Sequence, residues 1–171
     1  MSLLARLFTP RPDPREALRP LWHRTVELSR EPALYREDGV ADTVAGRFDM
    51  ITAVLAVVLL RLERDGLAAE TALLTELFVA DMDAQLRETG VGDVVVGKHM
   101  GKLMSALGGR LGALREALAS GEDAELEAAL ARNVTMADGQ GTAALALRLR
   151  AFAGKLAALG EDEVLAGRIA L

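Results

Sequence analysis

The sequence contains no cysteine in its 171 residues. That absence excludes disulfides, thiol nucleophiles and thiolate-bound zinc. Aromatic residues are also scarce, at 4%, whereas Ala and Leu dominate an apolar share of 51%. Strands are enriched in β-branched and aromatic residues, so this composition favours helices. The longest uninterrupted apolar run, 53–60, is far shorter than the roughly 20 residues needed to cross a bilayer.

Patterns of catalytic or metal-binding residues are missing as well. The sequence has no nucleophile elbow and no phosphate-binding glycine loop. The two histidines, His23 and His99, lie far apart with no neighbouring His or Cys, which does not predict a metal site. Asp81 and Asp83 are two residues apart, so they face different sides of a helix and cannot hold one ion. We therefore predict a protein that is not an enzyme and that uses no metal and no cofactor.

The formal net charge is −5, but the two signs are unevenly distributed. Residues 1–36 hold 7 Arg against 4 acidic residues, a balance of +3, and the remainder holds 13 basic against 21 acidic residues, a balance of −8. An acidic chain with one short basic arm does not resemble a nucleic-acid footprint. We therefore expect no nucleic-acid partner.

The first residues are amphipathic. Leu3, Leu4, Leu7 and Phe8 share one face of a short helical segment within an N-terminal arm, 1–12. Such a face is suited to contact with an anionic membrane surface, and the alternative is that it packs on the domain or frays. The arm lacks the long apolar stretch and cleavage site of a secretory signal. We expect a cytoplasmic protein, with peripheral contact to the inner membrane as a further hypothesis.

Hydrophobic periodicity predicts an all-α fold, a single-domain compact bundle of about six or seven helices over residues 13–171. Asp13 before Pro14 is typical of a helix start, and Asp42 or Thr43 is placed to start the second helix. That second helix is apolar all round in its middle, which predicts a central position. The predicted helices cover about 13–31, 42–64, 69–88, 93–118, 122–132 and 145–159, with a loop over 34–42 and a last short turn at 164–169.

Small residues recur along the 93–118 helix, at Gly97, Gly101, Ser105, Gly108 and Gly112. Because each glycine inside a helix costs about 1 kcal/mol relative to alanine, the pattern suggests close backbone packing. We expect this ridge to meet the second helix inside the fold; the alternative is that it receives a helix from a partner.

Three charged side chains lean toward the apolar stripes. Arg47 precedes Ile51 by four residues, Asp81 follows Phe78 by three, and Arg110 lies within the stripe of its helix. A charge taken out of water needs a partner, so we predict that Asp81 pairs with Arg47 or Arg110 across helices. Two interpretations remain open: a structural ion pair, or charges that line a groove for a binding partner.

Several motifs occur in a recognisable order. They are Leu34-Tyr35-Arg36, residues 39–43, Gly46-Arg47-Phe48-Asp49-Met50, residues 76–83, residues 86–93, and Gly109-Arg110. Together they resemble the ubiquinol-cytochrome c chaperone family, firmly over about 34–118. One departure is that Leu107-Gly108 precedes the Gly-Arg pair, where the family usually has an aromatic residue.

The resemblance implies a non-catalytic assembly factor for the cytochrome bc1 complex (ubiquinol-cytochrome c reductase) that holds immature cytochrome b. Without a mitochondrial presequence, the chain resembles a bacterial member of the family. The resemblance leaves the partner subunit unspecified. Residues 13–171 would then form the chaperone domain behind the arm 1–12.

The leading hypothesis places the client in a groove between the 42–64, 69–88 and 93–118 helices, bounded by Arg47, Asp81, Asp93 and Arg110. The alternative is a helical lipid- or quinone-binding module at the membrane surface. In that case flexible methionine side chains would line the pocket: Met50, Met82, Met100 and Met104.

Overall fold

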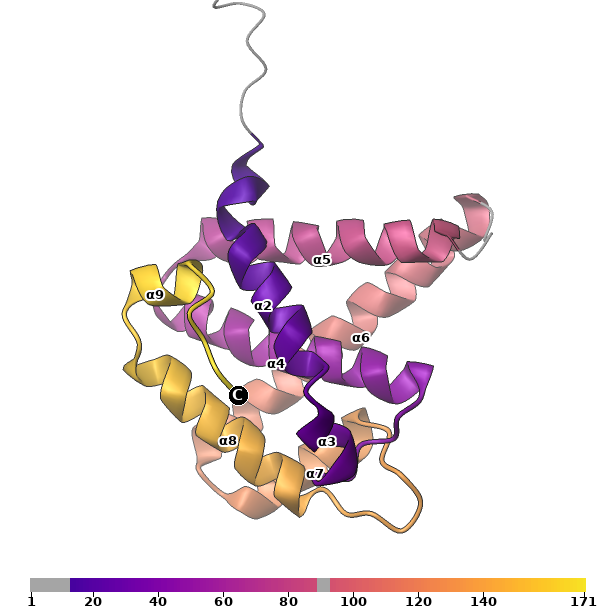
Figure 1. Ribbon diagram of the computed structural model, residues 1–171, viewed down its shortest axis with the longest axis vertical. Helices are drawn as coiled ribbons and strands as arrows, with labels where there is room; N and C mark the ends of the chain where they lie inside the picture. The colour runs from indigo at the N-terminus through magenta and orange to yellow at the C-terminus, as the bar shows by residue number, and fades with distance from the viewer. Residues whose placement is uncertain (1–12, 89–92) are drawn as a thin grey trace, which may run out of the picture.

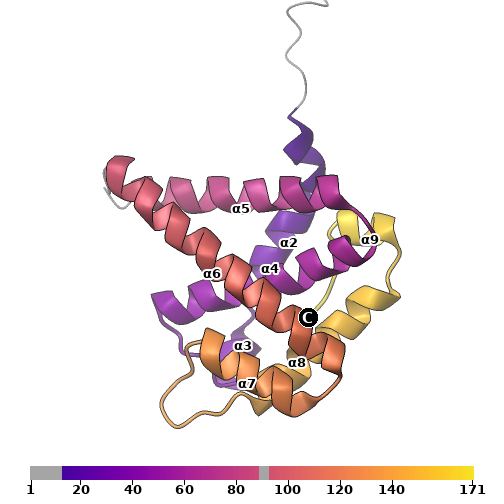
Figure 2. The same cartoon turned by 180° about the vertical axis from the view of Figure 1, so that it is seen from behind.

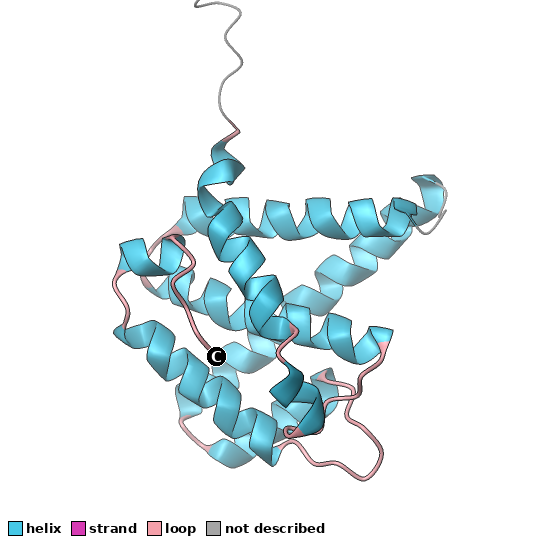
Figure 3. Cartoon of the chain, in the orientation of Figure 1, coloured by secondary structure: helices cyan, strands magenta, loops and turns pink. Residues whose placement is uncertain are grey.

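The computed structural model describes residues 13–88 and 93–171, with side chains described from Gly97 onward in the second range. Its elements are η1 (Pro14–Leu18), α2 (Arg19–Ser29), α3 (Pro32–Arg36), α4 (Val44–Arg64), α5 (Ala68–Glu88), α6 (Asp93–Ser120), α7 (Asp123–Asn133), α8 (Ala143–Ala158) and α9 (Glu161–Leu165) (Figure 1). No strand forms within these two ranges, where Val40 and Met136 make one isolated bridge (Figure 3). The predicted all-α fold is confirmed.

Local sequence signals set the helix starts. The Asp13 carboxylate accepts a hydrogen bond from the backbone N–H of Arg15 at 2.9 Å, so Asp13 caps η1. Thr43 caps α4 in the same way, accepting from the N–H of Gly46 at 3.1 Å. Gly66, with φ +77°, follows the end of α4. The predicted boundaries of the second helix are therefore confirmed.

Two predicted boundaries are wrong. The first helix is divided into η1 and α2, because Pro20 has no N–H to continue the hydrogen-bond ladder across the junction. The expected loop over 34–42 also contains the second half of α3. Pro32 does not simply end the preceding helix, since it occupies the first position of α3, where a fixed φ and a missing N–H are tolerated.

Helix α4 is the centre of the fold. Every residue from Asp49 to Leu59 is buried, and α4 contacts α2, α5, α6 and α8. Figure 2, the view from behind, shows α6 crossing in front of α4, while α5 runs along the edge of the molecule and meets α6 at one corner. The predicted central position of this helix is confirmed, and its all-round apolar surface is explained by neighbours on every side.

The small-residue ridge of α6 does not pack inside the fold, so the internal packing that we expected is wrong. A Cβ atom added at Gly97, Gly101, Gly108 or Gly112 would meet nothing within 4 Å. The core-facing side chains of α6 include Leu107 and Leu114. At 3.6 residues per turn, the glycines lie roughly 80–160° around the helix from these leucines, on a side where an added Cβ meets no neighbour.

Candidate functional site

Arg110 of α6 is buried, with 8% of its surface exposed. Its Nη2 pairs with the carboxylate of Asp49 on α4, its Nη1 donates to the hydroxyl of Thr52, and its Nε donates to the backbone oxygen of Asn133 at 2.9 Å. The second carboxylate oxygen of Asp49 accepts from the N–H and the hydroxyl of Thr135, at 2.8 and 2.6 Å. This Asp49–Arg110 ion pair therefore joins α4, α6 and the segment after α7.

The predicted pairing of Asp81 with Arg47 or Arg110 is wrong. Arg47 instead pairs with Asp42 at 2.7 Å on the surface, and Asp81 accepts a hydrogen bond from Gln85 on its own helix at 3.4 Å. Arg110 does lean inward as expected, but its partner is Asp49. The reason is geometric. Arg110 lies beside Asp49 of α4, whereas Asp81 faces the groove between α2 and α5.

Asp49 belongs to the motif Gly46-Arg47-Phe48-Asp49-Met50, but the sequence did not lead us to expect that its charge is buried. Asp49 lies next to Phe48 and two residues before Ile51, so the stripe that pointed to Arg47 did not point to Asp49. One signal was available: Asp49 and Thr52 are short polar residues at i, i+3 spacing within the otherwise apolar stretch 48–60. Both are buried and both contact Arg110.

Arg47 lines a small groove beside α3. The groove is also lined by Arg30, Tyr35, Arg36 and Asp42. The side chains of Arg47 and Asp42 are 61% and 59% exposed, so their ion pair contributes little to stability. The hydrogen bond from Arg47 lowers the pKa of Asp42, and partial burial raises the pKa of Tyr35. This groove presents three guanidinium groups around one carboxylate.

Asp81 lines a different groove, between α2 and α5. Trp22 and Leu77 form part of its apolar lining, and Trp22 contacts Phe78 edge-to-face with 6.1 Å between ring centroids. Arg30 lines both this groove and the groove of Arg47. The two surfaces are thus neighbours along the N-terminal helices rather than one groove between α4, α5 and α6.

Of the four residues predicted to bound one groove, the three with described side chains do not share one. Arg110 is buried in the fold, and Arg47 and Asp81 line separate surfaces. The side chain of Asp93 lies outside the described residues. The proposed membrane-contact residues also lie outside them: Leu3, Leu4, Leu7 and Phe8.

The methionines do not line a common pocket, which contradicts that part of the alternative hypothesis. Met50 and Met82 are core residues, with 0% and 6% of their surfaces exposed. Met100 is half-buried against the core, and Met104 is 36% exposed. Their different depths follow from their helix positions, since Met50 belongs to the central helix and Met104 to the outward side of α6.

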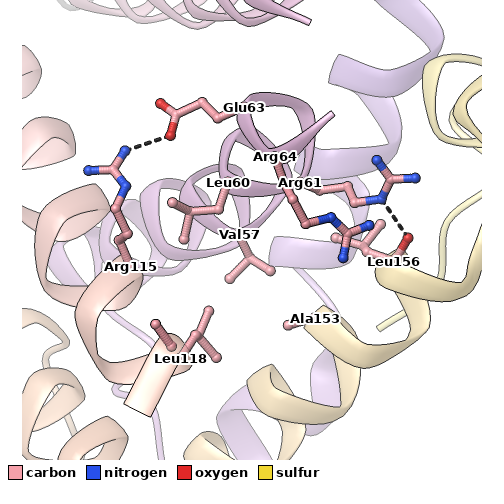
Figure 4. A pocket seen from close by; sticks show the side chains of 10 residues that line it. Val57, Leu60, Arg61, Glu63, Arg64, Arg115, Leu118, Ala153 and Leu156 are labelled. Carbon is pink, nitrogen blue, oxygen red and sulfur yellow. Dashed lines mark hydrogen bonds and ion pairs between the residues drawn. The ribbon is translucent and has the colours of Figure 1, made fainter. Parts of the chain in front are cut away.

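A third surface, between α4, α6 and α8, combines an apolar floor with an arginine rim (Figure 4). The floor consists of Val57, Leu60, Leu118, Ala119, Ala153 and Leu156, and the rim of Arg61, Glu63, Arg64 and Arg115. We call it the α4–α6–α8 pocket. Its arginines lie outside the apolar stripes, so the periodicity of the sequence did not single them out.

Arg61 holds one side of this pocket together. Its Nε and Nη2 donate to the backbone oxygens of Leu156 and Leu159, both at 2.9 Å, at the C-terminal end of α8. The Leu156 oxygen also accepts a hydrogen bond from the N–H of Leu159 at 3.3 Å. A cation at this end of α8 adds donors for its last carbonyls and interacts favourably with the helix dipole. Burial lowers the pKa of Arg61, and the nearby charge of Arg64 lowers it further, while Glu161 acts in the opposite direction.

The described side chains offer ion pairing, hydrogen bonding and apolar contact. Among them, no group of three or more His, Cys, Asp or Glu residues is placed to hold a metal ion. None of the described helices combines the length and the apolar character needed to cross a bilayer.

The structure is therefore that of an all-α protein with arginine-lined surface grooves and the buried Asp49–Arg110 ion pair. Residues 36–171 match the model of the ubiquinol-cytochrome C chaperone family. The chain belongs to this family, as the motifs of its sequence suggested, and the match extends through the C-terminal helices.

A solved structure supports the same assignment. The chain resembles the crystal structure of the Cbp3 homolog from Brucella abortus, with a TM-score of 0.77 and 28% sequence identity. The likeness covers 90% of this chain and 87% of that one. A search of curated proteins finds no match. The family and this homolog support a ubiquinol-cytochrome c chaperone role.

Proposed function

We propose that this protein is a non-catalytic assembly chaperone that binds immature cytochrome b for biogenesis of the cytochrome bc1 complex. The family match over residues 36–171 carries the proposal, and the likeness to the Cbp3 homolog supports it. We further propose that it works in the cytoplasm of a bacterium, at the inner-membrane surface. An apolar client that is about to enter the bilayer is met there.

The client contact is proposed for the face that carries Arg47 and Asp81. Both side chains are accessible and line neighbouring grooves that share Arg30. Charged groups at the rim of an interface favour specific encounter and exclude wrong partners. Arg110 is assigned to the fold rather than to the client, because its donors are already used by Asp49, Thr52 and Asn133.

Affinity capture from bacterial membranes that contain cytochrome b tests this proposal. The wild type is compared with Arg47→Ala and Asp81→Ala, and with matched controls Arg132→Ala and Asp138→Ala, which change exposed residues that line neither groove. We expect the wild type and both controls to recover cytochrome b, and the two groove variants to recover several-fold less. Circular dichroism confirms beforehand that each variant is folded.

Two outcomes would contradict the proposal in different ways. If the wild type recovers no cytochrome b, the client assignment is wrong. If Arg47→Ala and Asp81→Ala capture as much as their controls, the client binds elsewhere on the molecule.

A further inference from the structure

The α4–α6–α8 pocket has the composition of a site for an amphiphile. Val57 and Leu60 of α4 point into it, Leu118 of α6 closes one side, and Ala153 of α8 lies opposite (Figure 4). The small side chain of Ala153 leaves room above the floor. Ligand pockets typically combine such an apolar lining with a few polar groups that fix orientation.

The rim carries more positive than negative charge. Arg115 pairs with Glu63 at 2.5 Å, and Arg61 pairs with Asp65. Arg64 lies 3.4 Å from the same Asp65 carboxylate and keeps 54% of its side chain exposed. Three guanidinium groups therefore share two carboxylates at this rim. The charge that remains is complementary to one anionic group, and Arg64 is the most accessible cation beside the floor (Figure 4).

The size of the pocket limits which kinds of ligand can fit in it. Its volume is about 510 Å³, which lies within the range of small-molecule sites, roughly 300–1,000 Å³. A helix with its side chains is about 10–12 Å wide, and a pocket this small does not enclose one. An acyl chain is thin and flexible enough to lie between α4, α6 and α8.

We propose that the α4–α6–α8 pocket binds a long-chain acyl amphiphile with a single negative headgroup, with the chain on the apolar floor and the headgroup at Arg64. A fatty acid and a lysophospholipid share this chemistry. The site shares no lining residue with the grooves of Arg47 and Asp81. It therefore does not depend on the proposed client binding, and either assignment can fail without the other.

Calorimetric titration of the full chain tests the site with three lauroyl compounds below their micellar concentrations. Laurate carries a carboxylate, lauroyl lysophosphatidylglycerol a phosphodiester, and monolaurin no charge. We expect saturable binding of at least one anionic compound and at least tenfold weaker binding of monolaurin, because only the anions pair with Arg64. Binding of laurate alone identifies a fatty acid as the source of the ligand, and binding of the lysophospholipid identifies a membrane lipid.

Two pairs of variants locate the binding. Arg64→Gln should raise the Kd of the bound anion at least fivefold, whereas Arg132→Gln, an exposed arginine on α7, should leave it unchanged. Ala153→Leu should block the floor, whereas Ala151→Leu makes the same substitution on the exposed side of the same helix and should not. Thermal unfolding confirms that all four variants fold.

Three results would overturn the proposal. They are no saturable binding of either anion, equal binding of laurate and monolaurin, and equal affinity of Ala153→Leu and Ala151→Leu. Binding of an apolar peptide that carries a free C-terminal carboxylate, in the absence of laurate binding, would also overturn it and assign the pocket to a peptide.

Discussion

Single residues decide how the buried charges of this protein are satisfied. Asp49 is 7% exposed and Arg110 is 8% exposed, and four hydrogen-bonding groups from α4 and residues 133–135 surround the pair. A buried pair with this much hydrogen bonding offsets its desolvation cost only while both partners are present. Asp49 and Arg110, which both belong to the family motifs, thus have a structural role that the family resemblance alone did not define.

The consequence at this scale concerns Asp49→Ala. Removing the carboxylate leaves the Arg110 charge buried without its partner, so we expect the free energy of unfolding to fall by about 3–5 kcal/mol. Asp42→Ala breaks the exposed pair with Arg47 and serves as the control, with little or no expected loss because solvent screens this pair. Urea denaturation of both variants measures the difference. Similar losses for the two variants would show that the Asp49–Arg110 ion pair has no special structural role.

At the scale of elements, Gly46 of α4 and Gly101 of α6 are chemically identical but have opposite roles. A Cβ at Gly46 would overlap the backbone oxygen of Ala41, so the first turn of α4 requires a residue without a side chain. A Cβ at Gly101 in α6 would meet open space. Helix α4 contains one glycine and α6 contains five. These numbers do not reveal the difference, because the distinction depends on the neighbouring segment.

The matched substitutions Gly46→Ala and Gly101→Ala follow from this contrast. Gly101→Ala should raise the free energy of unfolding by about 1 kcal/mol, because alanine is the better helix former. Gly46→Ala should lower it by about 1–3 kcal/mol, because the Cβ forces the backbone apart. Thermal unfolding, followed by circular dichroism, should therefore shift Tm in opposite directions. A lower Tm for Gly101→Ala would mean that another segment approaches this side of α6.

At the scale of the whole molecule, the two grooves and the α4–α6–α8 pocket lie on separate parts of the surface. The grooves of Arg47 and Asp81 lie along the N-terminal helices, and the α4–α6–α8 pocket lies between the central and C-terminal helices. The three proposed partners, a client, a lipid and a membrane surface, are therefore proposed for different parts of one chain. Membrane contact stays a prediction for the arm 1–12, on the basis of the sequence.

Liposome flotation tests that assignment. Deletion of residues 1–12 should reduce binding to anionic vesicles several-fold, because both the apolar face and two arginines are lost. The double variant Leu4→Gln, Leu7→Gln should reproduce most of the loss while keeping the charge. Binding to neutral vesicles measures the part of the interaction that does not depend on anionic lipid. Unchanged flotation of the deletion variant would rule out the arm as the membrane contact.

Local signals allowed much of the helical architecture to be predicted. Asp13 and Thr43 cap helices through hydrogen bonds within three residues, and the apolar middle of 42–64 indicated a central helix. These features depend on contacts close in sequence and on the helical period, both of which are visible in the chain itself. The family motifs added the functional class by resemblance.

Tertiary structure alone decided which charges meet and where pockets form. Arg110 joins Asp49 across 61 positions, and the periodicity of either helix indicates a direction without identifying the helix that lies there. The same holds for the ridge of α6, whose glycines indicated close packing but face open space. The α4–α6–α8 pocket depends on the packing of three helices, which brings their apolar side chains together beneath arginines that the sequence places on separate elements.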